Sequence, residues 1–204
     1  MVRAMIVSVR PPFRLLQRRK PREERPPRAA LHRRIFLVGP MGSGKTTLGR
    51  RLAALSRMEF VDSDHEIERR TGVDIPFIFE KEGEAGFRRR EHDVLAELAE
   101  REGVVVATGG GAVLNADTRR RLHDKGLVIY LHASVDQQLR RTARSSHRPL
   151  LRSGDRRATL ERLLAERDPL YREIAHRIVK TDGRNTRALA QEIFRNLRKE
   201  TAES

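Results

Sequence analysis

A glycine-rich segment between an apolar run and a helical pattern limits the possible folds of this chain more than any other feature. Residues 39–47 read GPMGSGKTT and fit the pattern G-x-x-x-x-G-K-[ST]. Directly before them, residues 35–38 (IFLV) form a short apolar run typical of a buried parallel strand. After them, Leu48, Leu52 and Leu55 recur at helical spacing. A strand, a glycine-rich loop and a helix in this order predict a phosphate-binding loop at one edge of a parallel sheet.

The residue types in this loop suit the phosphate groups of a nucleotide. Glycines let main-chain N–H groups turn inward around a polyphosphate, and Lys45 adds positive charge for the outer phosphates. The hydroxyl group of Thr46 can reach a magnesium ion. The loop residues expected to contact the nucleotide are Gly42, Ser43, Gly44, Lys45, Thr46 and Thr47.

From residue 34 onward, strand and helix patterns alternate, which predicts an α/β fold of the P-loop NTPase type. We expect three layers, with a five-stranded parallel sheet flanked by helices. Strands are predicted at residues 35–38, 58–61, 104–107, 127–131 and 177–180. Helices are predicted at residues 63–71, 84–101, 116–125, 134–144, 157–167 and 187–197. A capping box of Ser63 and Glu66 is expected to start the first of these helices, and Gly72 to end it.

The net charge of +15 is concentrated at the start of the chain. Residues 1–34 hold eleven Lys or Arg and two acidic residues, whereas the remaining 170 residues hold 32 basic and 26 acidic ones. We therefore expect residues 1–33 to be a disordered Pro- and Arg-rich leader and residues 34–204 to be the folded domain. An RNA-binding or membrane-surface arm and an organelle transit peptide are alternatives for the leader.

The remaining composition favours a cytoplasmic protein. The chain has no cysteine, which excludes disulfides and thiolate metal sites. No apolar stretch is long enough to span a membrane, so no membrane partner is expected. The seven histidines show no metal-binding spacing. Aromatic residues make up 4% of the chain and tryptophan is absent, which leaves little for stacking on nucleic-acid bases, so no nucleic-acid partner is expected for the folded domain.

A second basic stretch interrupts the helical patterns late in the chain. Residues 140–157 contain seven arginines and one acidic residue, broken by serine, proline and glycine. We expect a mobile lid at about residues 144–157 that folds over bound phosphates, because a P-loop enzyme must exclude water while the γ-phosphoryl group is being transferred. A solvated basic loop is the alternative.

Two carboxylates follow the second predicted strand. Residues 58–64 read MEFVDSD, so Asp62 and Asp64 reach the strand's carboxyl end, where ligands bind in α/β sheets. One of them can hold magnesium through water, and the other can accept a hydroxyl proton or orient a hydroxyl group. Alternatively, Asp64 only caps the next helix.

Two further segments suggest a site for a second, acidic ligand. Arg88 and Glu91 are three residues apart in a predicted helix, where the carboxylate can orient the guanidinium toward a ligand carboxylate. A surface salt bridge is the alternative. Gly109, Gly110 and Gly111 follow the third strand and leave main-chain groups accessible to a ligand, although a plain tight turn would also contain glycine.

Together, these segments resemble shikimate kinase of the bacterial type, a P-loop kinase of small molecules. The resemblance covers residues 34–197 and depends on the joint order of its motifs, because each one except the first is weak alone. The motifs are GPMGSGKTT at 39–47, DSD at 62–64, GFR at 86–88, TGGG at 108–111, RPLL at 148–151 and RDPLYR at 167–172.

The resemblance implies transfer of the γ-phosphoryl group of ATP to the 3-hydroxyl of shikimate, with Mg²⁺ as cofactor, by a monomeric enzyme of aromatic amino acid biosynthesis. It implies catalytic roles for Asp64, Lys45 and Arg148. Arg141, Arg148 and Arg184 join the loop residues in binding ATP, and Thr46 and Asp62 lie near the metal. The residues implied for shikimate binding are Asp64, Arg88, Gly109, Gly110, Gly111, Arg167, Phe79 and Phe87.

Two other functions fit parts of the sequence. A gluconate kinase or a nucleoside monophosphate kinase would share the P-loop and a basic lid, but the DSD, GFR and RDPLYR segments favour shikimate. An RNA-associated nucleotide-binding protein would explain the charge, although most of that charge lies in the leader.

Overall fold

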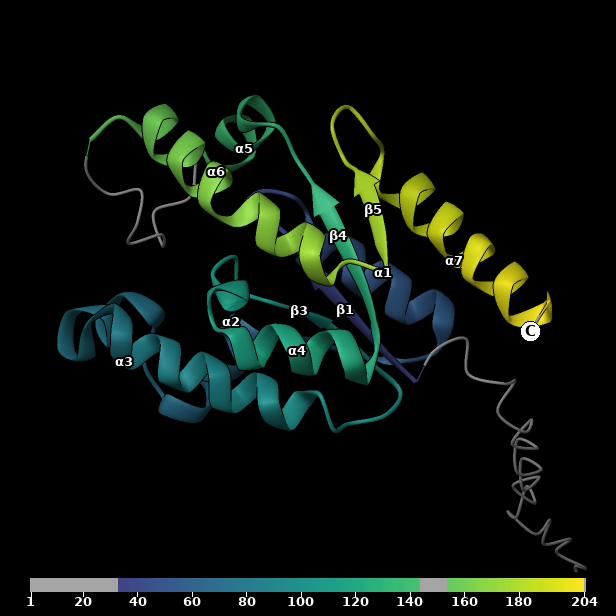
Figure 1. Ribbon diagram of the computed structural model, residues 1–204, viewed down its shortest axis with the longest axis horizontal. Helices are drawn as coiled ribbons and strands as arrows, with labels where there is room; N and C mark the ends of the chain where they lie inside the picture. The colour runs from purple at the N-terminus through teal and green to yellow at the C-terminus, as the bar shows by residue number, and fades with distance from the viewer. Residues whose placement is uncertain (1–32, 144–153, 204) are drawn as a thin grey trace, which may run out of the picture.

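The computed structural model describes residues 33–143 and 154–203 (Figure 1). The predicted leader, Arg148 and the larger part of the predicted lid lie outside these residues. Within the described part of the chain, no helix is both long and apolar enough to cross a bilayer.

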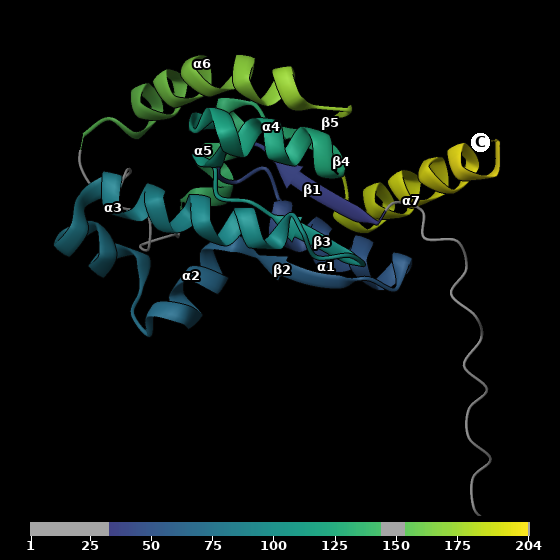
Figure 2. The same ribbon diagram turned by 60° about the horizontal axis from the view of Figure 1, so that its bottom comes forward.

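Five parallel strands form one sheet in the order β2-β3-β1-β4-β5 (Figure 2). The register pairs Phe36 of β1 with Val106 of β3 on one side and with Val128 of β4 on the other. The strands are β1 (Arg34–Val38), β2 (Glu59–Asp62), β3 (Val104–Ala107), β4 (Leu127–His132) and β5 (Arg177–Lys180). All five predicted strands are confirmed, with bounds shifted by one residue at most.

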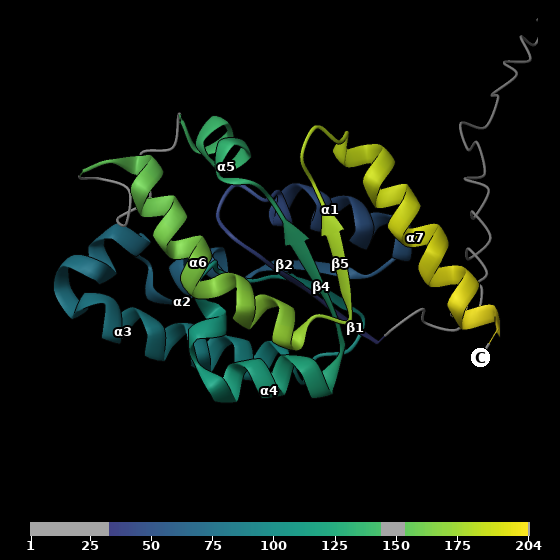
Figure 3. The ribbon, with the colours of Figure 1, turned by 45° about the horizontal axis from the view of Figure 1, so that its top comes forward.

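Helices cover both faces of this sheet, which confirms the three-layer prediction (Figure 2). One face of the sheet is covered by α1 (Lys45–Ser56) and α7 (Thr186–Glu203), which lie side by side (Figure 3). The remaining helices are α2 (Ser63–Thr71), α3 (Ile75–Leu98), the 3₁₀ helix η1 (Ala112–Leu114), α4 (Ala116–Lys125), α5 (Val135–Thr142) and α6 (Arg156–Ile174).

The alternation of side chains along β1 divides the core into two clusters. Ile35 and Leu37 pack with apolar residues of α1 and α7, whereas Phe36 and Val38 pack with those of α2, α3, α4 and α6. All four side chains are fully buried, and each contributes about 1.5–3 kcal/mol to folding. Because β1 is central and buried on both faces, the loop that follows it starts from a rigid position.

The start of α2 differs from the predicted capping box. The N-cap is Asp62, whose side chain accepts a hydrogen bond from the main-chain N–H of Asp64. The Ser63 hydroxyl instead accepts from the main-chain N–H of Gly109, 46 residues further along the chain. The predicted end is correct, because Gly72 terminates α2 in the left-handed conformation.

Helix α3 begins earlier than predicted and reverses direction at Gly83. This residue has φ 68° and ψ −178°, so α3 consists of two helical arms, Ile75 to Glu82 and Glu84 to Leu98. Side chains eight positions apart meet across the reversal: Arg90 donates two hydrogen bonds to Glu82.

Helix α6 also extends beyond its predicted range, since it continues through Pro169 to Ile174. Helix α4 has the predicted bounds, and α7 begins one residue before the predicted start and runs on to Glu203. Helix α5 ends at Thr142, two residues before the predicted end.

Candidate active site

The phosphate-binding loop links the carboxyl end of β1 to the first turn of α1, as predicted (Figure 1). Its conformation requires glycine at Gly39, where φ is 140° and a Cβ atom would lie 2.5 Å from the main-chain oxygen of Leu131. Gly44, with φ 94°, precedes α1, whose first N–H groups have no partners within the helix and are oriented toward the loop. An anion placed there meets both these N–H groups and the positive end of the helix dipole.

Lys45 places its charge inside this loop. Its Nζ donates hydrogen bonds to the main-chain oxygens of Gly39, at 2.7 Å, and Pro40, at 2.9 Å, and the residue is 9% exposed. The hydroxyl oxygen of Ser43 is buried and has no hydrogen-bond partner. An oxygen of a phosphate group bound in the loop would accept hydrogen bonds from the Ser43 hydroxyl and the Lys45 ammonium. Thr47 lies exposed on the first turn of α1.

Thr46 and Asp62 meet between α1 and the end of β2. The Thr46 hydroxyl donates to Asp62 Oδ2 at 2.7 Å. A hydroxyl and a carboxylate oxygen beside a phosphate site match the ligands of Mg²⁺, which is held by one or two protein oxygens together with substrate phosphates. No cluster of three or more His, Asp or Glu side chains suited to a metal occurs among the described residues.

Asp64 lies in the first turn of α2, and Asp62 rather than Asp64 caps that helix. The Oδ1 atom of Asp64 is buried and has no hydrogen-bond partner. Burial raises the pKa of this carboxyl group to about 7, with further contributions from Glu91 and Asp62, while Lys45 and Arg88 lower it. A carboxylate with a pKa near neutrality is suited to accepting a hydroxyl proton.

Arg88 and Glu91 form a partly buried pair on the second arm of α3. Arg88 donates to Glu91 Oε2 at 2.6 Å and to Glu84 Oε1 at 3.0 Å. Glu91 is 2% exposed, so the interpretation of this pair as a surface salt bridge is wrong. Burial raises the pKa of Glu91, although the charges of Arg88 and Arg167 oppose this shift.

Two of the three glycines after β3, Gly109 and Gly111, lie against these groups. A Cβ atom on Gly109 would lie 2.2 Å from Glu91 Oε1 and 2.7 Å from Asp64 Oδ1. A Cβ atom on Gly111 would lie 2.3–2.4 Å from the Arg88 guanidinium. Positions 109 and 111 therefore have no room for a side chain, and a plain tight turn does not account for them.

Gly110 faces the phosphate-binding loop instead. A Cβ atom on Gly110 would lie 3.6 Å from the Met41 nitrogen and 3.7 Å from the Gly39 oxygen. The glycine segment therefore contacts both the phosphate-binding loop and the acidic and basic side chains of α2 and α3.

Arg167 approaches the same site from α6. It is 6% exposed, and its Nε has no hydrogen-bond partner. Asp64 Oδ1 and Glu91 Oε1 are likewise buried and unpartnered. Such atoms are rare in folded proteins because each costs about 1–3 kcal/mol. Asp64, Glu91 and Arg167 lie close together, so a polar ligand bound between them would pair with these atoms.

Two phenylalanines border this group of charges. The rings of Phe79 and Phe87, one on each arm of α3, have centroids 4.9 Å apart. The Arg88 guanidinium carbon lies 5.1 Å from the centroid of the Phe87 ring. The reversal at Gly83 thus brings Phe79 to the helix arm that carries Arg88.

Arg141 and Arg184, both expected to bind ATP, contact the same residue, Thr181. Arg141 of α5 donates to the main-chain oxygens of Gly42, at 3.0 Å, and Thr181, at 3.3 Å. Arg184 lies in the turn that starts at Thr181, where its guanidinium pairs with Glu192 of α7. Arg148 lies outside the described residues.

Sequence reasoning assigned no role to Tyr171, whose hydroxyl donates to the Gly110 oxygen at 2.5 Å. It also missed the contacts that Ser63 makes with Gly109 and that Thr181 makes with Arg141. The RDPLYR motif contains Tyr171, but a short motif does not reveal which loop its side chain contacts.

A phosphate-binding loop and a second site of buried carboxylates and guanidinium groups, joined by one glycine segment, define a P-loop kinase of small molecules. The family model described as shikimate kinase matches residues 41–198. The chain therefore belongs to the shikimate kinase family.

Individual relatives agree with this assignment. The chain is 57% identical to a shikimate kinase of Nitrosococcus oceani over 80% of its own length and 86% of that protein. It is 54% identical to a shikimate kinase of Shewanella denitrificans over 81% of its own length and 96% of that protein. The shikimate kinase from Acinetobacter baumannii, solved in complex with shikimate, has a TM-score of 0.80 and 53% identity, covering 82% of this chain and 94% of that one.

Proposed function

We propose that this enzyme transfers the γ-phosphoryl group of ATP to the 3-hydroxyl of shikimate, with the acid held between α2, α3, α6 and the glycine segment. One observation carries this proposal: the buried, unpartnered polar atoms of Asp64, Glu91 and Arg167 gather beside the phosphate-binding loop. Membership in the shikimate kinase family supports the identity of both substrates.

The two arginines are suited to the substrate's carboxylate. Arg88 is held by Glu91 and Glu84, and Arg167 has a buried nitrogen without a partner. Guanidinium groups bind carboxylates through paired, charge-assisted hydrogen bonds. Asp64 then faces the substrate's hydroxyl groups, and its raised pKa fits a group that orients the reacting hydroxyl and accepts its proton.

The phosphate-binding loop positions the donor. Main-chain N–H groups of residues 42–47 and the Lys45 ammonium surround the β- and γ-phosphates, which lowers the cost of the charge that builds up on the transferred group. Thr46 and Asp62 are the residues that would hold Mg²⁺, which neutralises phosphate charge when bound. Phosphoryl transfer depends on such alignment and charge more than on covalent help from the protein.

The other assignments follow from the same arrangement. Arg141 bonds to the main-chain oxygens of Gly42 and Thr181, and the main-chain N–H of Arg184 also bonds to Thr181. These contacts support the proposal that both arginines border the nucleotide base. Phe79 and Phe87 form an apolar wall for the shikimate ring. The role of Arg148 in the lid, a monomeric state and a cytoplasmic location stay predictions from the sequence.

Coupled release of ADP tests this function. We expect strong, Mg²⁺-dependent turnover with shikimate and little with quinate, gluconate or nucleoside monophosphates offered in parallel. Comparable turnover with gluconate or a nucleoside monophosphate would contradict the assignment. Turnover without any acceptor would indicate an ATPase instead.

A further inference from the structure

The two tyrosines of this chain form one buried unit next to the proposed substrate site. Tyr130 of β4 and Tyr171 of α6 are fully buried, and their rings stack with centroids 5.0 Å apart. No other tyrosine and no tryptophan occurs in the sequence. Despite this stacking, their hydroxyl groups have different partners.

The hydroxyl of Tyr171 contacts the glycine segment. It donates to the main-chain oxygen of Gly110 at 2.5 Å. Burial raises the pKa of this hydroxyl, so it stays protonated and remains a donor throughout the physiological range. The Gly110 oxygen is thereby tied to a rigid helix, whereas the neighbouring Gly109 is tied to Ser63 of α2 through its N–H.

The hydroxyl of Tyr130 contacts helix α6 instead. It donates to Asp168 Oδ1 at 2.6 Å, and the other oxygen of Asp168 accepts from Arg172. This contact stabilises the packing of α6 on the sheet without involving the glycine segment. The two tyrosines therefore give a natural comparison, since each can lose one buried hydroxyl while keeping its ring.

The position of Tyr171 in α6 connects two parts of the substrate site. Arg167 lies four residues earlier, which is one helical turn, so both side chains lie on the same face of α6. Burial raises the pKa of the Tyr171 hydroxyl, while the charge of Arg167 and a hydrogen bond from its side chain oppose this shift, so the two side chains are neighbours. Tyr171 thus links the helix that carries Arg167 to the loop that separates Asp64 from Glu91.

We propose that Tyr171 is a positioning residue for the acid substrate: its hydroxyl fixes the Gly110 carbonyl relative to Arg167, so that residues 109–111 are ordered before the substrate binds. The proposal rests on the function given above. A glycine segment has high backbone freedom, and a single strong anchor reduces the entropy that substrate binding must otherwise remove.

The test compares Tyr171→Phe with Tyr130→Phe in steady-state kinetics on the full chain. Tyr171→Phe leaves the Gly110 oxygen without its donor, and we expect the KM for shikimate to rise about five- to tenfold. The KM for ATP and kcat should stay within about twofold. Tyr130→Phe should leave the KM for shikimate within about twofold, although both variants should lower the melting temperature to a similar extent.

Hydrogen–deuterium exchange of the free enzyme supplies a second readout. We expect faster exchange of the main-chain amides of residues 109–114 in Tyr171→Phe than in the wild type or Tyr130→Phe, because the segment opens more often. An unchanged KM for shikimate in Tyr171→Phe, or equal increases in the two variants, would overturn the proposal. A wild-type enzyme inactive with shikimate would instead refute the function on which it rests.

Discussion

At the scale of single residues, Gly109 lies where two buried carboxylates leave no room for a side chain. We expect Gly109→Ala to lower the free energy of unfolding by about 1–3 kcal/mol, because its Cβ would overlap Glu91 Oε1 and Asp64 Oδ1. Urea unfolding measures this change. Gly110→Ala is the matched control, since its Cβ would meet only ordinary contacts at 3.6 Å or more. Equal destabilisation by both substitutions would show that the segment responds to any added methyl group.

Arg88 is expected to act mainly in binding the acid. In Arg88→Ala, the KM for shikimate should rise at least about tenfold while the KM for ATP stays within about twofold, because charge-assisted hydrogen bonds contribute about 1.5–3 kcal/mol each. Steady-state kinetics with each substrate varied in turn checks this. Glu84→Gln is the control, since it removes an exposed partner of Arg88 and keeps the partly buried pair with Glu91. An unchanged KM for shikimate in Arg88→Ala would exclude the proposed contact.

At the scale of elements, the reversal inside α3 depends on the backbone of Gly83. Its φ of 68° and ψ of −178° are nearly exclusive to glycine, while space is open around its Cα. We therefore expect Gly83→Ala to lower the free energy of unfolding by about 1–3 kcal/mol, purely through backbone strain. Thermal unfolding measures the effect.

A comparison with Arg90→Gln distinguishes the stability contributed by the Gly83 backbone from that contributed by the Arg90–Glu82 ion pair. The Arg90–Glu82 pair is partly exposed, so its loss should cost less than about 1 kcal/mol. If Arg90→Gln destabilised the protein more than Gly83→Ala, the ion pair and not the glycine would hold the two arms together.

The elements also show where sequence patterns suffice. All five strands and the P-loop were predictable because their apolar runs and glycine spacing are local signals. The N-cap of α2 was not predictable, because Asp62 and Ser63 are both residue types that cap helices well. The hydrogen bond from the Gly109 N–H occupies the Ser63 hydroxyl, and Asp62 becomes the cap. The first arm of α3 was also missed, because it has only eight residues and is held by contacts across Gly83.

The same distinction applies to the site. The motifs placed Lys45, Asp64 and Arg88 at strand ends and on a helix, and the structure brings the three together. The burial of Asp64 Oδ1 and its closeness to Glu91 could not be predicted, since both result from the packing of α2, α3 and the glycine segment.

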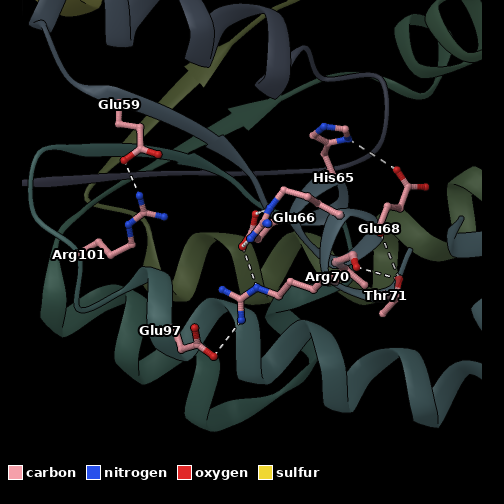
Figure 4. Close-up of polar contacts among 10 residues, drawn as sticks. Glu59, His65, Glu66, Glu68, Arg70, Thr71, Glu97 and Arg101 are labelled. Atoms are coloured by element: carbon pink, nitrogen blue, oxygen red, sulfur yellow. Dashed lines mark hydrogen bonds and ion pairs between the residues drawn. The ribbon is translucent and has the colours of Figure 1, made fainter. Parts of the chain in front are cut away.

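At the scale of the whole molecule, charge pairs that join α2 to α3 and β2 to the loop after α3 make stability depend on pH. Figure 4 shows Arg70 between Glu66 and Glu97, and Arg101 bonded to Glu59. Hydrogen bonds from Arg69 and Arg70 lower the pKa of Glu66 from 4.5 to about 2. Below pH 4.5 the unfolded chain takes up a proton at Glu66 that the folded protein does not, so acid favours unfolding.

We therefore expect the contribution of Glu66 to be complete above about pH 4.5 and to disappear as the pH falls toward 2. Urea unfolding at intervals between pH 5 and pH 2.5 measures this decline, which should be shallower in Glu66→Gln. Arg70→Gln should remove only part of the pH dependence, because Arg69 still bonds to Glu66. Parallel pH profiles for the wild type and Glu66→Gln would contradict this origin.

The pairing of β2 directly with β3 has a consequence for how such an enzyme changes its acceptor. Glu59 lies opposite Val104, so the chain from α2 through α3 leaves one strand and returns to its immediate neighbour. Asp64, Arg88 and Glu91 all belong to this excursion. Arg167 and residues 109–111 lie outside it, so a change of acceptor combines changes in this stretch with changes in α6 or the glycine segment, while the strand alignment and the nucleotide site after β1 stay as they are.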